Sequence, residues 1–173
     1  MEERDTADGL SGESILREVR AAGVSFVVSV PDITTSDGLL RPLAAGTDPR
    51  LIRICKEDEG IGICAGLAHA DKRALLLIQH TGLLDSINAL RGVACEYELP
   101  ICMMVGLLAK EPGVAPRQSK QYGVRIVEPI LEAMGIAYHE IEEAADIPKI
   151  KPAIDESYAR SRPVALLIGR QPS

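Results

Sequence analysis

The chain has 173 residues, a formal net charge of −6, 46% apolar side chains and 25% charged side chains. This composition is typical of a single globular domain and excludes a disordered chain. The acidic balance argues against nucleic-acid binding, and with no Trp and one Phe the chain lacks the aromatic platforms on which single-stranded nucleic acids stack.

Residues 1–10 are rich in charge and are predicted to form a flexible tail, so that one domain spans residues 11–173. The tail lacks the apolar segment of a secretory signal, and no apolar run reaches the roughly 20 residues of a membrane helix, so we expect a cytoplasmic protein. The four cysteines form no Cys-x-x-Cys pair, which predicts reduced thiols in the core and no metal site in this chain.

The first half of the chain alternates helical and extended patterns. Ser11 and Ser14 offer N-cap chemistry for a helix that ends before Gly23, and a β-branched run ends at Pro31. In chain order the patterns predict a helix up to residue 22, a strand over 24–30, a short helix over 38–45, a strand over 51–55, a small-residue helix over 57–70 and a strand over 74–78.

The second half continues the alternation. The patterns predict a loop over 79–85, a helix over 86–96, a strand over 100–106, a polar connection over 109–122, a helix over 126–134, a strand over 137–141, a helix from 146 or 148 to 160 and a strand over 163–168. Strands that alternate with helices predict an α/β fold: a single doubly wound domain with a six-stranded, mainly parallel sheet flanked by helices.

Ligands of such a sheet bind beyond the carboxyl ends of its strands. At the end of the second strand, Glu57, Asp58 and Glu59 open a helix. Acids in a first turn ordinarily complement the helix dipole, by about 0.3–1 kcal/mol each, and this is the default interpretation. The glycines that follow, Gly60 and Gly62, reduce the bulk of the helix and favour a second interpretation, the close approach of a ligand or another chain.

The loop after the third strand, Gln79-His80-Thr81-Gly82, also admits two interpretations. It is either a simple turn in which Thr81 or Ser86 caps the next helix, or part of a site beside the acidic cluster. No Rossmann, P-loop or nucleophile-elbow motif occurs in the sequence. Of the remaining histidines, His69 near a helix end is interpreted as a surface or capping residue and His139 in a strand as structural.

Three stretches of the chain together resemble the pyrimidine-binding domain of thiamine diphosphate enzymes. They are residues 57–68 (EDEGIGICAGLA), 74–83 (ALLLIQHTGL) and 86–90 (SINAL). Within that group the chain is most similar to the sulfopyruvate decarboxylase alpha subunit and its relative phosphonopyruvate decarboxylase. The resemblance covers most of residues 11–170 and implies the thiamine diphosphate-binding fold.

The resemblance also implies roles for single residues. Glu57, nine residues before Gly66, matches the glutamate that hydrogen-bonds the aminopyrimidine ring and activates the cofactor, with Glu59 as the alternative. The residues implied to bind the cofactor are Pro31, Asp32, Glu57, Gln79, Thr81 and Gly82. Those implied to bind the anionic substrate are Gln79 and His80. The chain departs from the pattern of related decarboxylases at Asp32, His80, Leu84 and Asp85.

The Gly-Asp-Gly motif, with which these enzymes hold the diphosphate and Mg²⁺, does not occur in this sequence. The resemblance therefore implies a beta subunit that carries this half of the site. We expect the alpha subunit of a hetero-oligomeric, thiamine diphosphate-dependent decarboxylase that converts 3-sulfopyruvate, or 3-phosphonopyruvate, into an aldehyde and CO₂, as in coenzyme M biosynthesis. The alternatives are a non-catalytic paralogue that scaffolds or regulates a partner, and a subunit of another thiamine diphosphate carboligase.

Overall fold

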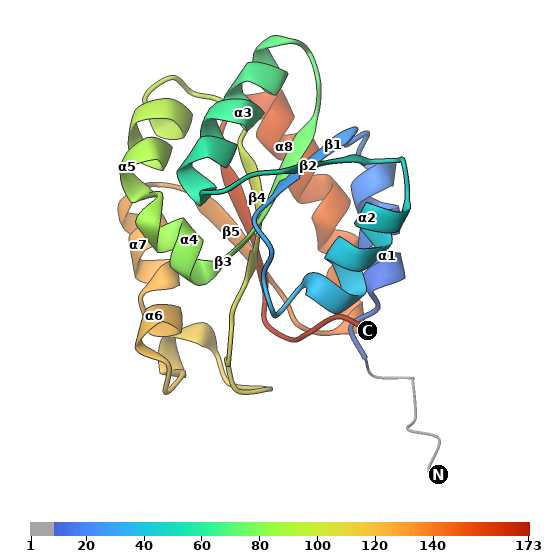
Figure 1. The fold of residues 1–173 in the computed structure, drawn as a ribbon. Coiled ribbons are helices and arrows are strands. Elements are labelled where there is room, and N and C mark those ends of the chain that lie inside the picture. The colour runs from blue at the N-terminus through green and yellow to red at the C-terminus, as the bar shows by residue number, and fades with distance from the viewer. Residues whose placement is uncertain (1–8) are drawn as a thin grey trace.

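Six parallel strands form the sheet at the centre of the fold (Figure 1). The computed structural model describes residues 9–173, and the strands lie in the order β2-β1-β3-β4-β6-β5. Their bounds are β1 Phe26–Ser29, β2 Arg50–Arg53, β3 Ala74–Gln79, β4 Cys102–Gly106, β5 Ala137–Ile141 and β6 Val164–Ile168. Every neighbouring pair is parallel, which confirms the predicted α/β fold.

One face of the sheet is covered by helices from the two ends of the chain. They are α1 Gly12–Ala21, the π-helical turn η1 Ser36–Leu40, α2 Arg41–Ala45, η4 Ala144–Lys149 and α8 Ile150–Arg160. Ile15, Leu39 and Ile154 belong to the same buried cluster as Val27 and Leu166 of the sheet. Burial of this apolar surface, at roughly 25 cal/mol for each Å², holds the layer on the sheet.

The opposite face is covered by helices from the middle of the chain (Figure 1). They are α3 Glu57–His69, α4 His80–Asp85, α5 Ile87–Ala89, η2 Leu90–Cys95, α6 Tyr122–Arg125 and α7 Val127–Ala133, with a short 3-10 turn, η3 Pro116–Gln118, before α6. A Cβ at Gly60 of α3 would overlap the Leu76 side chain of β3. The missing side chain therefore lets α3 lie close against the sheet.

The arrangement brings four strand ends together at one edge of the sheet. Since β2, β1, β3 and β4 are consecutive neighbours and parallel, their carboxyl ends lie side by side. Segments 30–35, 54–57, 79–82 and 106–107 follow these ends. The residues implied to bind cofactor or substrate lie in these segments, and Glu59, the alternative to Glu57, lies two residues further on in α3.

Two elements differ from the prediction. The loop predicted over 79–85 is helix α4, which begins directly after β3. The helix predicted over 126–134 begins four residues earlier and is divided into α6 and α7. Pro129 explains the division, because it has no N–H to donate to the carbonyl of Arg125, so the helix restarts after Ile126.

The predicted placements of Leu10 and of one cysteine are also wrong. Leu10, predicted to lie in the tail, is only 1% exposed, and its carbonyl accepts a hydrogen bond from the Ser173 N–H (3.0 Å). Gly9 of the predicted tail is exposed, and residues 1–8 lie outside the described residues. Burial raises the pKa of Cys64 and Cys102 to about 12, whereas Cys55, just after β2 at the sheet's edge, is exposed and does not belong to the core.

Residues 9–173 contain neither of two features that would change the expected class of protein. None of their helices is long and apolar enough to cross a membrane. No group of three or more His, Cys, Asp and Glu side chains is arranged so that it could hold a metal ion.

Candidate active site

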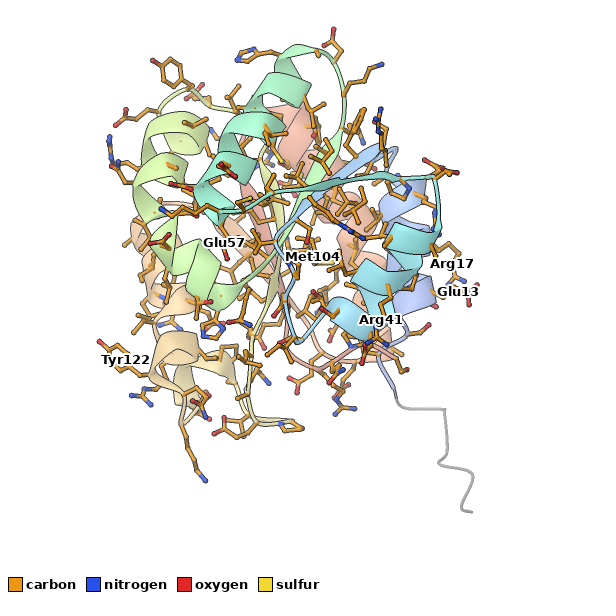
Figure 2. All side chains as sticks on the ribbon, viewed as in Figure 1. Glu13, Arg17, Arg41, Glu57, Met104 and Tyr122 are labelled. Carbon is orange, nitrogen blue, oxygen red and sulfur yellow. The ribbon has the colours of Figure 1, made fainter. Side chains whose placement is uncertain are left out.

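Glu57 is the first residue of α3, at the carboxyl end of β2, and Figure 2 shows it beside α4. Its half-buried side chain lies against Gly82 of α4, where any Cβ would overlap Cγ, Cδ and Oε1 of Glu57. Within residues 9–173 the carboxylate has no hydrogen-bond or ion-pair partner. A half-buried carboxylate without a partner is available to an external donor.

The two neighbouring acids are used within the helix start. Glu59 Oε2 accepts hydrogen bonds from the N–H groups of Cys55 (3.2 Å) and Lys56 (3.3 Å), which is the capping arrangement of a helix N-terminus. Asp58 pairs with Lys56 at 3.3 Å, and Lys56 also pairs with Asp85 of α4 at 3.3 Å. Of the three acids, Glu57 is therefore the one whose carboxylate faces a possible ligand.

Asp32 follows β1 and is buried, with 3% of its surface exposed. Its Oδ1 accepts from the Thr34 N–H (3.1 Å) and from Gln79 Nε2 (2.8 Å), and its Oδ2 accepts from the Thr35 N–H (3.1 Å) and Thr35 Oγ1 (3.0 Å). Four donors satisfy the buried charge. The acid at this position therefore organises the turn before η1. Pro31, the residue before it, is exposed.

Gln79 connects the first and third strand ends. Its Nε2 donates to Asp32, and its Oε1 accepts from Thr81 Oγ1 at 2.8 Å. Because both ends of this amide are bonded, its orientation is fixed. The predicted residues Asp32, Gln79 and Thr81 thus form one hydrogen-bonded chain, and Glu57 joins the same group through its contact with Gly82.

The imidazole of His80 is buried, with 6% of the residue exposed, and lies against glycine backbone on α6. Nε2 is 2.9 Å from the position that a Cβ on Gly123 would take, and Nδ1 is buried with no hydrogen-bond partner in the described part of the chain. Burial lowers the pKa of His80, an effect that the Gly106 backbone and the Asp32 carboxylate only partly offset. His80 is therefore neutral at pH 7.

The lowered pKa of His80 predicts how stability depends on pH. The unfolded chain binds this proton more readily than the folded chain, so the free energy of unfolding is highest above the ordinary His pKa of about 6.5 and falls as the pH drops below it. Urea unfolding between about pH 7.5 and about pH 5.5 measures the slope. His80→Gln should flatten it, whereas the control His69→Gln, at the exposed end of α3, should not. Equal slopes in the two variants would contradict the assignment.

The structure adds three residues that the sequence did not single out. A Cβ on Gly106 would overlap Asp32 Oδ2 and lie 3.0 Å from Thr34 Cβ, and Gly123 contacts His80. Thr34 Oγ1 is a second buried polar atom without a hydrogen bond among residues 9–173. Gly106 lies at the start of the long connection after β4, and Gly123 lies at its end in α6. No pattern in the sequence indicates that either glycine contacts the site.

The rim of this edge carries two exposed apolar side chains. Ile33, next to Asp32, and Tyr122, next to Gly123, are each 70% exposed. Figure 2 shows Tyr122 on the outer side of α6. Both side chains are exposed in the chain alone and are accessible to a partner.

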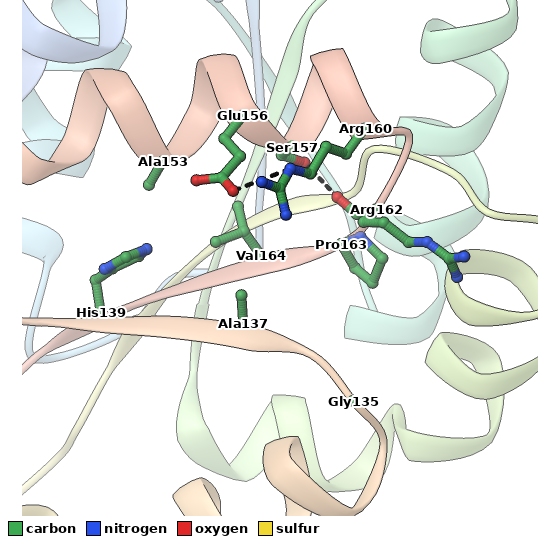
Figure 3. Close-up of a pocket in the computed structure, with 10 residues that line it drawn as sticks. All are labelled: Gly135, Ala137, His139, Ala153, Glu156, Ser157, Arg160, Arg162, Pro163 and Val164. Atoms are coloured by element: carbon green, nitrogen blue, oxygen red, sulfur yellow. Dashed lines mark hydrogen bonds and ion pairs between the residues drawn. The ribbon is translucent and has the colours of Figure 1, made fainter.

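A separate hollow of about 270 Å³ lies at the opposite edge of the sheet, near the amino ends of β5 and β6 (Figure 3). Its two arginines are already paired, Arg160 with Glu156 at 3.1 Å and Arg162 with Glu98 at 2.5 Å. None of the predicted site residues lines it. The hollow is therefore unrelated to the site at the carboxyl edge.

Comparison with known proteins places the sequence among curated relatives, although no protein-family model matches the chain. The sulfopyruvate decarboxylase subunit alpha of Methanococcus maripaludis is 30% identical over 161 residues, 91% of this chain and 93% of the relative. The corresponding subunit of Methanocaldococcus jannaschii is 27% identical over 155 residues, 89% of this chain and 90% of the relative. The sulfopyruvate decarboxylase of Methanosarcina acetivorans is 30% identical over 158 residues, 90% of this chain but 39% of the relative.

Among solved structures, the benzoylformate decarboxylase from Polynucleobacter necessarius matches with a TM-score of 0.63 and 17% identity, over 92% of this chain and 30% of that chain. At this identity the match shows the fold alone. This chain thus spans less than half of the length of both the Methanosarcina relative and the benzoylformate decarboxylase chain.

Proposed function

The chain belongs to the family of sulfopyruvate decarboxylase alpha subunits, and from this premise we propose that it is the alpha subunit of a two-subunit, thiamine diphosphate-dependent decarboxylase. The proposed substrate is a small anionic 2-oxo acid, 3-sulfopyruvate or 3-phosphonopyruvate, and the products are the aldehyde and CO₂. The observation that carries the proposal is the free Glu57 carboxylate, held against Gly82 at the edge of the sheet where α/β folds bind ligands.

The residues at this edge fit one half of the cofactor, the aminopyrimidine ring. Glu57 offers an acceptor without a partner, and Thr34 Oγ1 and His80 Nδ1 are buried polar atoms that no group among residues 9–173 satisfies. Pro31, Asp32, Gln79, Thr81 and Gly82 would form the remaining wall. When bound, thiamine diphosphate supplies the carbon nucleophile and the electron sink that allow a 2-oxo acid to lose CO₂.

The proposed task of Glu57 is to share a proton with a nitrogen of that ring. A carboxylate does this best in a desolvated pocket, where a charge-assisted hydrogen bond is strong. Glu57 is half-buried at the first residue of α3, and a bound cofactor would exclude water from its exposed part. Gly82 leaves the space that the side chain needs.

We propose that His80 and Gln79 bind the substrate. A neutral, buried imidazole can donate one hydrogen bond to an anionic oxygen or carry a proton to the product, and either requires that one ring nitrogen face the ligand. Asp32 serves the substrate indirectly, because its hydrogen bond fixes the amide of Gln79 (2.8 Å).

The beta subunit is proposed to bind the diphosphate and Mg²⁺, since the sequence contains no Gly-Asp-Gly motif. The names of the relatives as subunit alpha support a partner chain. The test of the whole proposal is reconstitution with a partner that carries this motif, followed by CO₂ release from 3-sulfopyruvate, 3-phosphonopyruvate and pyruvate. An assembled complex that releases no CO₂ from any 2-oxo acid would favour a scaffolding role.

Tyr122 is expected to anchor this assembly. Tyr122→Glu places a charge on the apolar rim and should weaken association with the partner roughly tenfold or more, the usual effect of losing an interfacial aromatic. Tyr97→Glu is the matched control, because Tyr97 is 75% exposed but lies at the amino end of β4, away from the site. Titration calorimetry measures both dissociation constants. Equal changes in the two variants would exclude Tyr122 as an anchor.

A further inference from the structure

The contact between His80 and Gly123 joins two elements that are distant in the sequence. His80 begins α4, directly after β3, and Gly123 is the second residue of α6, after the long connection that follows β4. The two helices pack against each other, and Nε2 and Cδ2 of His80 lie 2.9 and 3.1 Å from the position that a Cβ on Gly123 would take. Real Cβ atoms essentially never approach another atom as closely as 2.9 Å, so a side chain on residue 123 would have to move the ring.

Helix α6 is not free to move away instead. Glu111 accepts hydrogen bonds from Ser119 Oγ (2.7 Å) and the Lys120 N–H (3.0 Å). Arg125 donates to the carbonyls of Ser119 (2.9 Å) and Lys120 (3.0 Å). The residue after Gly123 is Val124, which is fully buried in the core. The hydrogen bonds therefore fasten α6 to the connection before it, and buried Val124 anchors the helix in the core.

Strand backbone bounds the ring as well. Nδ1 is buried without a hydrogen bond, and the ring adjoins the backbone of Gly106, the last residue of β4. Asp32, in the turn after β1, is the charged group that acts on His80, while Arg125 of α6 lies over the Tyr122 ring at 5.5 Å. Strand backbone on one side and helix backbone on the other leave the ring one orientation.

We propose that Gly123 is a positioning residue: its missing side chain lets α6 close against the Nε2 edge of the His80 ring, which fixes the ring and leaves Nδ1 as the nitrogen available to a ligand. This rests on the proposed function for the role of His80 in turnover, but the contact itself is a property of the chain alone. The position of α6, which follows the connection after β4, would then determine which ligand atoms the His80 ring can contact.

The first test is the titration of His80 in the isotopically labelled chain, read from its imidazole NMR signals. His80→Gln identifies the signal among those of the three histidines. In Gly123→Ala the displaced ring gains solvent, so the midpoint should rise by about half a pH unit or more toward the ordinary value of about 6.5. Gly92→Ala is the control, because Gly92 is also helical and half-buried but has no atom within 4 Å of a Cβ. An unchanged midpoint in Gly123→Ala would overturn the proposal.

The second test is a double-mutant cycle on thermal unfolding. Gly123→Ala should lower Tm by roughly 2–4 °C in the wild-type background, and should not lower it when His80→Ala has vacated the space. If Gly123→Ala alone does not fold, the double variant should. A double variant that is as unstable as Gly123→Ala, or that also fails to fold, would show that Gly123 acts independently of His80 and would overturn the proposal.

The reconstituted complex gives the third measurement. Gly123→Ala should reduce kcat roughly tenfold and shift the pH profile in the same direction as the NMR midpoint, whereas Gly92→Ala should change neither. A complex that is inactive even with the wild-type chain would reject the proposed function but leave the titration and the unfolding cycle decisive for Gly123. Activity that Gly123→Ala does not affect, in an otherwise active complex, would reject the positioning role.

Discussion

Glu57→Gln is expected to reduce turnover of the reconstituted enzyme by about 10³-fold, within the range of roughly 10²–10⁴ for loss of a general acid–base group. Gln has nearly the same size and can still form a hydrogen bond, but it cannot share a proton with a ring nitrogen. Glu57 also has no partner among residues 9–173, so its replacement should leave the fold intact. Steady-state CO₂ release measures the loss, and sedimentation velocity checks that the complex still assembles.

Glu59→Gln is the matched control for this variant. The amide oxygen of Gln can still accept from the N–H groups of Cys55 and Lys56, so the cap should lose at most about 1 kcal/mol and turnover should stay within a factor of about three. The reverse result, with Glu59→Gln inactive and Glu57→Gln close to normal, would transfer the role to Glu59. Two active variants would remove both acids from the reaction.

The fold was predictable because its local and global patterns agree. The β-branched run before Pro31, the apolar run over 74–78 and the alternation with helices all favour a parallel sheet, and each strand is present. The helical character of residues 80–85 was not predictable. Gly82 and the polar side chains at 79–81 are typical of a turn, and the helix forms because its apolar residue Leu83 is buried against the sheet.

The site was predictable in part. The spacing to Gly66 singled out Glu57. The capping role of Glu59 depends on the path of the backbone at residues 55–56, which the sequence does not specify. Gly106 and Gly123 lie 24 and 41 residues after Gly82. Gly106 meets Asp32 only when the end of β4 lies beside the turn after β1, and Gly123 meets His80 only when α4 and α6 pack together. Local patterns carry no information about such contacts, because they depend on tertiary packing.

Three titratable side chains at this edge of the sheet each lie against a glycine. Asp32, Glu57 and His80 each lie where a glycine on another element has no side chain, at Gly106, Gly82 and Gly123 respectively. Backbone without a Cβ lets two elements and a titratable side chain approach closely, which concentrates polar groups at one edge of the sheet. The positions of these three side chains are therefore more sensitive to the glycines than to polar substitutions on the surface.

Gly82→Ala is expected to reduce turnover about 10²-fold without unfolding the chain. The new Cβ would overlap Cγ, Cδ and Oε1 of Glu57, so the Glu57 side chain must rotate away, and a displacement of about 1 Å at a reacting group can cost two orders of magnitude in rate. The displaced carboxylate can point into solvent, and Ala is the better helix former by up to about 1 kcal/mol, so the free energy of unfolding should change little. CO₂ release and urea unfolding measure the two quantities.

The same variant in the Glu57→Gln background separates two explanations. If the added methyl group acts by displacing Glu57, the double variant should turn over no more slowly than Glu57→Gln alone, because residues that act as a unit are not additive. If the methyl group instead blocks the bound ring directly, the double variant should also lose cofactor affinity relative to Glu57→Gln. Gly92→Ala, whose Cβ meets no atom within 4 Å, should leave both turnover and cofactor affinity unchanged. Additive losses in the double variant would mean that Gly82 contacts the cofactor and that the position of Glu57 does not depend on it.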